Sequence, residues 1–267
     1  MTRIYCFGIA SQALEGCNIP SALPFNNPEA LHISGLTVII APIEVETLPP
    51  RRRYMRAHTE LLEALNRIGT ALPMRFGVIA PDLSGLKRAI ETKRDHLLSL
   101  LMRLEGFVEY SITISTNRER FAALALESSP SLLMEQKSLK ANGRINRMTA
   151  MRFGQRLSDA MSDLRRKAEN TIMEALRPAI ADAILRAPEE DHQLLRADLL
   201  IHHHNEKAFE DFITDLTTRL RHSIDKRNQV HAAWTNEELR VRIIGPAPLF
   251  NFAECHIDLP QKSVKMS

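Results

Sequence analysis

The chain has 267 residues, enough for one large domain or two of ordinary size. Hydrophobic residues make up 44% of it and charged residues 25%, close to the globular average, which argues against a disordered chain. The net charge of +3 argues against a dedicated nucleic-acid-binding protein, because such proteins concentrate basic residues on one face.

The first half of the chain has the pattern of an α+β domain, which we place at residues 1–116. An apolar, β-branched run at residues 36–43 predicts a buried strand. Two prolines then break the chain, and a helix is predicted from about Arg51. The apolar face of this helix is expected to consist of Leu61, Leu65 and Ile68.

Four arginines crowd the start of this helix: Arg51, Arg52, Arg53 and Arg56. Cations at a helix N-terminus oppose the macrodipole, which is a small local cost. Such a charge run is usually a solvated basic turn. The alternative is a contact for an acidic partner.

Residues 71–79 insert a proline, an arginine and a glycine into an apolar run. Pro73 fits the edge or the entry of a strand, and Gly77 permits a positive φ. Arg75 keeps its charge, so it needs a partner if it is buried. We expect a short strand leading into a turn, with Arg75 enclosed and bonded to Glu109 of a neighbouring strand as a structural ion pair.

A second helix is predicted to begin after the N-cap Asp82 and to end at Gly106. Its apolar stripe is Leu83, Leu86, Ile90, Leu97, Leu101 and Leu104. The following residues alternate as a strand that carries Val108, Tyr110, Ile112 and Ile114 on one face. Strands and helices interleaved in this way favour a small sheet with two helices on one face, a ferredoxin-like arrangement.

The second half predicts another α+β domain of the same kind at residues 144–245, joined to the first by a helical linker at 117–143. A long helix is expected at residues 150–176, a strand at 196–201, a helix after Asn205 and a strand at 239–243. The fold class is therefore α+β with two domains.

Residues 246–267 are predicted to form an extended C-terminal tail. Its prolines block a regular helix or a central strand. Large apolar side chains such as Leu249 should not lie in water, so we expect the tail to pack against one of the domains.

Three consecutive histidines, His202, His203 and His204, stand at a strand-to-helix junction near Glu206. In a strand, the first and third would share a face, and a metal could bridge them. A Zn²⁺ site normally needs three or four converging ligands, so we interpret the triplet as a polar surface edge and expect no metal site.

No catalytic or cofactor-binding site is expected either. The sequence has no Gly-rich phosphate loop, GxSxG or HExxH motif. Its cysteines, Cys6, Cys17 and Cys255, are too irregularly spaced for a disulfide framework or a CxxC site. No signal peptide and no membrane-spanning run are seen. We expect a soluble, cytoplasmic protein that contacts neither membrane nor nucleic acid.

Several separated blocks, given below and spread along most of the chain, resemble the GvpF/GvpL family of gas vesicle proteins. Residues 72–77 resemble its "LPmRFG" signature, residues 4–9 and 36–43 look like two of its strands, and residues 104–112 are similar to "l-x-G-x-x-E-w-x-v". Residues 245–252 resemble "GPWPPYNF", with Ala247, Leu249 and Phe250 departing from that pattern. The motif residues are Pro73, Arg75, Phe76, Gly77, Gly106, Glu109, Gly245, Pro246, Pro248, Phe250 and Phe252.

This resemblance implies a non-enzymatic assembly or minor structural protein of gas vesicles, found in the cytoplasm and at the vesicle shell. It implies binding to the small hydrophobic shell protein, with other gas vesicle accessory proteins as further partners. An open sheet edge or an apolar groove could hold such a subunit. The F-like and L-like branches both stay open. The alternative function is a small-molecule-binding or metal-dependent enzyme on ferredoxin-like domains.

Overall fold

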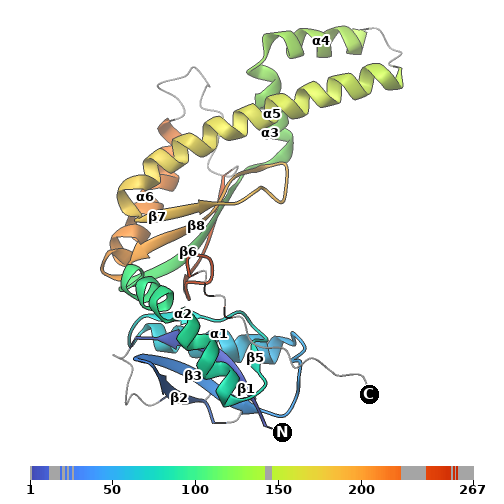
Figure 1. The fold of residues 1–267 in the computed structure, drawn as a ribbon. Helices are drawn as coiled ribbons and strands as arrows, with labels where there is room; N and C mark the ends of the chain where they lie inside the picture. Colours follow the sequence, from blue (N-terminus) through green and yellow to red (C-terminus); the bar gives the residue numbers. More distant parts are fainter. Residues whose placement is uncertain are drawn as a thin grey trace, which may run out of the picture. The chain divides into compact units, whose positions relative to one another are not determined.

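The computed structural model describes residues 2–11, 19, 22, 24–25, 27–141, 146–223, 239–253, 255 and 257, with the backbone alone for 216–223. The protein is α+β, with two antiparallel sheets and helices (Figure 1). It divides into two compact units: Met1–Glu109 with Gly245–Ser267, and Tyr110–Ile244. The C-terminal segment thus belongs to the first unit. Cys17 and the predicted junction at residues 143 and 144 lie outside the described residues.

The first unit contains a five-stranded sheet in the order β2-β3-β1-β4, with β5 also paired to β1. Its strands are β1 (Arg3–Ala10), β2 (Glu29–Ile33), β3 (Leu36–Ile43), β4 (Ala71–Pro73) and β5 (Ile79–Ala80). Every described pairing in this sheet is antiparallel. Because β1 and β3 lie in the middle, almost all of their residues are buried, on both faces.

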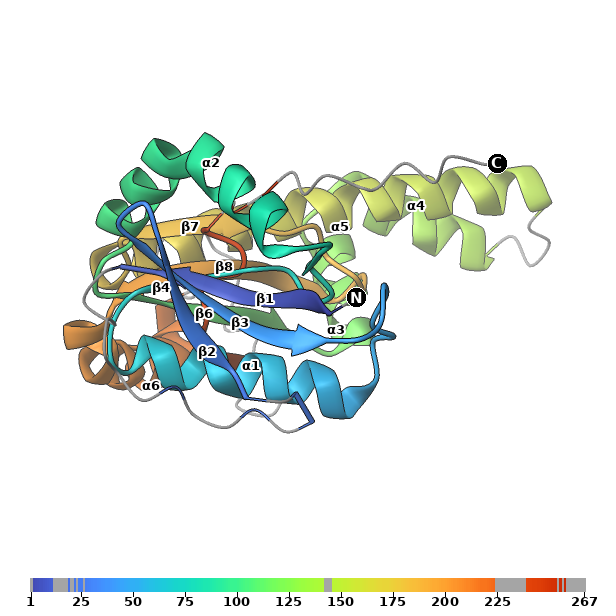
Figure 2. The ribbon, with the colours of Figure 1, turned by 60° about the horizontal axis from the view of Figure 1, so that its bottom comes forward.

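Two helices cover this sheet, α1 (Arg52–Asn66) and α2 (Leu83–Arg103). Helix α1 packs Leu62 and Leu65 against the face that carries Tyr5 and Phe7, and Figure 2 shows α2 on the other side of the sheet. This differs from the predicted ferredoxin-like arrangement, in which both helices share one face. The continuous burial along β1 is typical of a strand covered on both sides.

The helix boundaries follow local chemistry. Asp82 caps α2 as predicted, because its Oδ1 accepts a hydrogen bond from the Gly85 N–H at 2.7 Å. Gly106 has φ +74° after this helix. Ile68 was predicted on the apolar face of α1, but this helix ends at Asn66 and Ile68 is 51% exposed. That prediction was wrong because the apolar periodicity of the sequence continues beyond Asn66, where the helix ends.

The signature segment is not one strand. Pro73 pairs with Gly8 and Ile79 pairs with Tyr5, so β4 and β5 both lie along β1. The segment from Pro73 to Ile79 is longer than the facing segment of β1, and the extra residues leave the sheet. Gly77, with φ +89°, turns the chain back.

The second unit contains a four-stranded sheet in the order β7-β8-β6-β9. Its strands are β6 (Phe107–Ser115), β7 (Asp182–Leu185), β8 (Gln193–His202) and β9 (Arg240–Ala247). The unit boundaries fall inside β6 and β9. The helices are α3 (Arg118–Glu127), α4 (Pro130–Ala141), α5 (Arg147–Leu176) and α6 (Glu206–Ser223), with short 3₁₀ turns at Arg177–Ala179 and His203–Asn205.

Helix α5 is the longest element, and its predicted range agrees with the structure within a few residues. Only Ile172 and Leu176, near its C-terminal end, are buried in it. Helix α4 lies beside its N-terminal part, beyond the sheet of this unit (Figure 1). None of the described helices is both long enough and apolar enough to cross a bilayer.

Candidate functional site

A buried hydrogen-bond network joins the signature segment to β1 and α1. The Nε2 of His58 lies 3.0 Å from the carbonyl oxygen of Met74, and its Nδ1 lies 2.9 Å from the Tyr5 hydroxyl. Because a carbonyl only accepts, Nε2 carries the proton and Nδ1 accepts from Tyr5. The Tyr5 hydroxyl in turn lies 3.4 Å from the Gly77 N–H. Through Met74 and Gly77, this network holds the loop between β4 and β5 against β1 and α1.

Burial determines the charge state of this network. The side chains of Tyr5 and His58 are almost completely buried. Desolvation lowers the pKa of His58 from 6.5 to about 4, against the smaller opposing effect of the Met74 bond. His58 is therefore neutral near pH 7, as its two hydrogen bonds require.

This pKa makes stability depend on pH. The folded-state pKa of about 4 lies below the unfolded value of 6.5, so the unfolded chain binds a proton first as the pH falls. The contribution of His58 is complete above pH 6.5 and is lost toward pH 4, by about 3 kcal/mol. We expect this loss in urea unfolding at stepped pH, and a shallower pH dependence in His58→Gln. Equal dependence in both proteins would contradict a neutral buried His58.

Aromatic rings enclose His58 on several sides. Phe7 stacks on it with ring centroids 5.6 Å apart, and Phe250 stacks at 6.2 Å. Phe76 of the signature meets it edge-on at 5.9 Å. Phe7 of the block at residues 4–9 and Phe250 of the block at residues 245–252 therefore both stack on His58, within the first unit.

The C-terminal segment is anchored through Glu109. This carboxylate is buried, and its two oxygens accept from the backbone N–H of Asn251 at 2.9 Å and from its Nδ2 at 2.6 Å. Arg103 donates to the Phe252 carbonyl oxygen at 3.1 Å. Leu249 and Phe252 are buried, as their size predicts, whereas Phe250 is 39% exposed. Glu109 thus acts as the docking point of the segment.

The remaining motif residues frame this cluster. Pro73 ends β4 and is buried, and Gly106 donates to the Thr70 hydroxyl at 3.2 Å. Gly245 and Pro246 lie exposed at the end of β9, joined by a cis peptide bond, and Pro248 follows them, buried.

Arg75 does not belong to the enclosed cluster. It was predicted to be buried, and the structure shows it exposed. The prediction was wrong because residues 75–77 leave the sheet between Met74 and Val78, whose backbones still bond to β1, so the arginine lies on a loop that water reaches.

Sequence reasoning missed His58 and Tyr5, the centre of the network. A signal for His58 was present. It precedes Leu61, Leu62 and Leu65 by three, four and seven residues, which is the spacing of one buried helix face. A histidine in such a stripe must find partners when it is buried.

The thiols near this cluster are unreactive. Cys6 and Cys255 are free and buried. Desolvation raises the pKa of each thiol to about 12, so both stay protonated near pH 7 and do not act as nucleophiles. The cluster holds two motifs together, and neither of these two thiols is an exposed reactive group.

The second unit presents two other candidate sites. Met134 of α4 and Met148 and Met151 of α5 are exposed to 73%, 61% and 61%. At the end of β8, the ligand atoms of His202, His203 and His204 all lie within 4.8 Å of one another. The first site is apolar and suits a protein partner, and the second has the composition of a metal site.

Comparison with known proteins decides the family. The family model described as "Gas vesicle synthesis protein GvpL/GvpF" matches residues 3–254. The chain belongs to the GvpL/GvpF family. The expected resemblance is thereby confirmed, and this family is one of gas vesicle structural and assembly proteins that are not known as enzymes.

Individual relatives place the chain on the F-like side of the GvpL/GvpF family. "Gas vesicle protein F" of Streptomyces sp. (strain CB03234) is 26% identical over 227 residues, which cover 85% of this chain and 88% of that protein. "Gas vesicle protein L" of the same strain is 34% identical over only 59 residues, 22% of each chain.

Two crystal structures share the fold. GvpF from Microcystis aeruginosa aligns with a TM-score of 0.76 at 20% identity, over 95% of this chain and 99% of that one. GvpF from Anabaena sp. PCC7120 aligns with a TM-score of 0.79 at 19% identity, over 96% and 100%. The two-sheet α+β architecture is therefore that of GvpF.

Proposed function

We propose that this GvpF-like chain assists gas vesicle assembly by binding the small hydrophobic shell protein, and that the pair α4–α5 is the binding surface. The observation that carries this proposal is the exposure of Met134, Met148 and Met151 on neighbouring helices of one unit. The chain would act in the cytoplasm, at the growing shell, and without catalysis.

The helix pair is thinly packed. Leu132 is the buried residue of α4, and no residue of α5 before Ile172 is buried. Phe153, Leu157 and Met161 form the apolar stripe of α5 and are only half-buried. A stripe of this kind gains stability when another apolar surface covers it, because burial removes its side chains from water.

The pair is nevertheless held in place. Arg156 of α5 forms an ion pair with Glu135 of α4, and it also donates to the Ser131 hydroxyl at 3.3 Å. The backbones that carry the three exposed methionines are therefore held together, while the flexible methionine side chains can adapt to a partner. Methionine is frequent on surfaces that bind apolar helices for this reason.

A hydrophobic shell subunit suits such a surface. Before polymerisation, its apolar faces and unpaired strand edges expose it to aggregation. A reversible cover made by α4–α5 would prevent that and release the subunit to the shell. Other gas vesicle accessory proteins could occupy the same surface at a different stage.

Charge substitution tests this surface. We expect Met134→Lys, Met148→Lys and Met151→Lys together to reduce recovery of the shell protein with this chain by about tenfold or more, since each buried apolar side chain contributes roughly 1.5–3 kcal/mol. The measurement is co-purification from cells that express both proteins, with vesicle yield as a second readout.

Met102→Lys is the matched control. Met102 is 75% exposed on α2, in the other unit. The control variant should retain the shell protein at the wild-type level. Full retention by the triple variant, or equal loss in the control, would contradict α4–α5 as the binding surface.

A further inference from the structure

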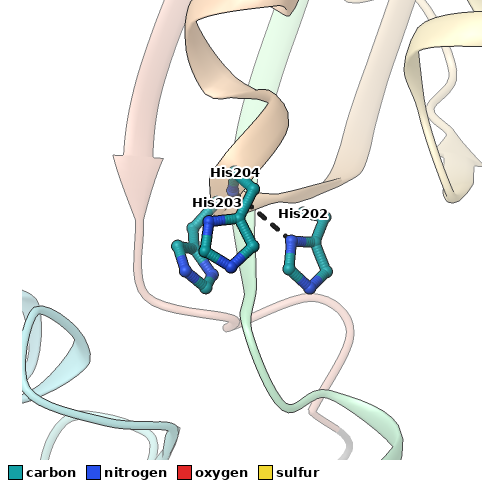
Figure 3. A group of neighbouring side chains, drawn as sticks. All are labelled: His202, His203 and His204. Atoms are coloured by element: carbon teal, nitrogen blue, oxygen red, sulfur yellow. Dashed lines mark hydrogen bonds between the residues drawn. The ribbon is translucent and has the colours of Figure 1, made fainter.

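The three histidines after β8 come together through a change of backbone conformation. Strand β8 ends at His202, and a 3₁₀ turn begins at His203. The turn brings all three rings to one side, as Figure 3 shows. Their centroids lie 4.8 Å, 4.9 Å and 3.8 Å apart. A continuing strand would have placed only the first and third together, which is why the sequence indicated an incomplete ligand set.

We propose that His202, His203 and His204 bind one divalent transition-metal ion, of the class of Zn²⁺, Ni²⁺ and Cu²⁺. Imidazole nitrogen is a preferred donor for these ions, whereas Mg²⁺ and Ca²⁺ prefer oxygen. Three protein ligands with an open fourth position are a common zinc arrangement. Water would fill the open position, or a side chain of a bound partner.

The geometry needs only side-chain rotation. The ligand atoms lie within 4.8 Å of one another, whereas tetrahedral bonds of about 2.1 Å place neighbouring nitrogens roughly 3.4 Å apart. His203 and His204 are exposed and His202 is half-exposed, so the rings can turn without disturbing the core. The structural cost of closing the site is therefore small.

The surroundings partly oppose and partly favour a cation. The site lies at the N-terminus of α6, whose positive dipole end disfavours a metal ion. Glu206, in the first turn, supplies a negative charge close by, and its Oε2 accepts from the Tyr110 hydroxyl at 2.8 Å. The Nδ1 of His202 accepts a long hydrogen bond of 3.4 Å from the His204 N–H. Metal binding exchanges this weak bond for a coordinate bond.

Zn²⁺ titration of the full chain without an affinity tag tests the site, with a chromophoric chelator as competitor. We expect one equivalent of Zn²⁺ to bind. The variant His202→Gln/His203→Gln/His204→Gln should weaken binding by at least about 100-fold, because losing a ligand costs more than losing its hydrogen-bond partner. Added Co²⁺ should give the visible absorption of nitrogen ligation in the wild type and not in the triple variant.

His96→Gln is the matched control, because His96 is exposed on α2 and stands outside the cluster. It should bind Zn²⁺ like the wild type. If the triple variant loses its far-UV circular dichroism, single His203→Gln replaces it, with an expected loss of at least about tenfold.

Equal Zn²⁺ affinity in wild type and cluster variants, or an equal loss in His96→Gln, would overturn the site. The readout is metal binding by the isolated chain, so its outcome is independent of shell-protein binding.

Discussion

Replacing Gly8 with valine is expected to unfold the first unit or to lower its free energy of unfolding by at least about 3 kcal/mol. A Cβ at Gly8 would lie 2.7 Å from the carbonyl oxygen of Leu72 and 2.9 Å from the Cδ2 of Leu62. The first of these atoms belongs to the backbone of β4, so β4 would have to move away from β1. Urea unfolding followed by hydrogen exchange of peptides from each unit measures the loss.

Gly154→Ala is the matched control, and its expected effect on stability has the opposite sign. Gly154 lies inside α5, and its added Cβ would meet no atom within 4 Å. Alanine should therefore stabilise the second unit by about 0.5–1 kcal/mol, through helix propensity alone. A Gly8→Val protein with wild-type exchange in the first unit would show that β1 and β4 do not pack as closely as the structure indicates.

Phe252→Ala is expected to cost about 3–5 kcal/mol in the first unit, the usual loss for a buried phenylalanine. Phe252 is 4% exposed, and it follows Asn251, whose two hydrogen bonds to Glu109 fix the segment. The cavity would form at the anchored part of the C-terminal segment, where neighbouring atoms cannot collapse freely. The same unit-resolved urea unfolding measures it.

Phe250 provides the comparison within the same segment. It is 39% exposed and contacts His58 by stacking. Its replacement by alanine should cost only about 1 kcal/mol. If Phe250→Ala destabilised the first unit more than Phe252→Ala, the segment would be held by the His58 stack and not by the buried anchor.

The long periodic helices were predictable from the sequence, and the short edge strands were not. The leucine stripe and the N-cap residue Asp82 predict helix α2. Strands β2 and β7 have only five and four residues, without a strong alternating pattern. They form because β3 and β8 offer them unpaired backbone groups, and that pairing is a property of the assembled sheet.

The motifs of the candidate site were visible in the sequence, but their roles were not. Arg75 stood out by charge and proved to be exposed on a loop, whereas His58 lies within an ordinary helical stripe and forms the centre of the network. Local spacing cannot tell which residues leave a sheet, because the length of the facing strand decides it.

The sequence by itself determined the family, the α+β class and the main helices, because these depend on local periodicity and on motifs of neighbouring residues. Only the tertiary structure decided which distant residues meet. Glu109 and Asn251 are 142 residues apart, and their contact exists because the C-terminal segment returns to the first unit. The three histidines, although consecutive, bring their ring nitrogens within 4.8 Å of one another because β8 ends at His202 and a 3₁₀ turn begins at His203. The contact between Glu109 and Asn251 depends on chain packing, which no local pattern encodes, whereas the histidine group depends on where β8 ends, which the sequence pattern did not indicate.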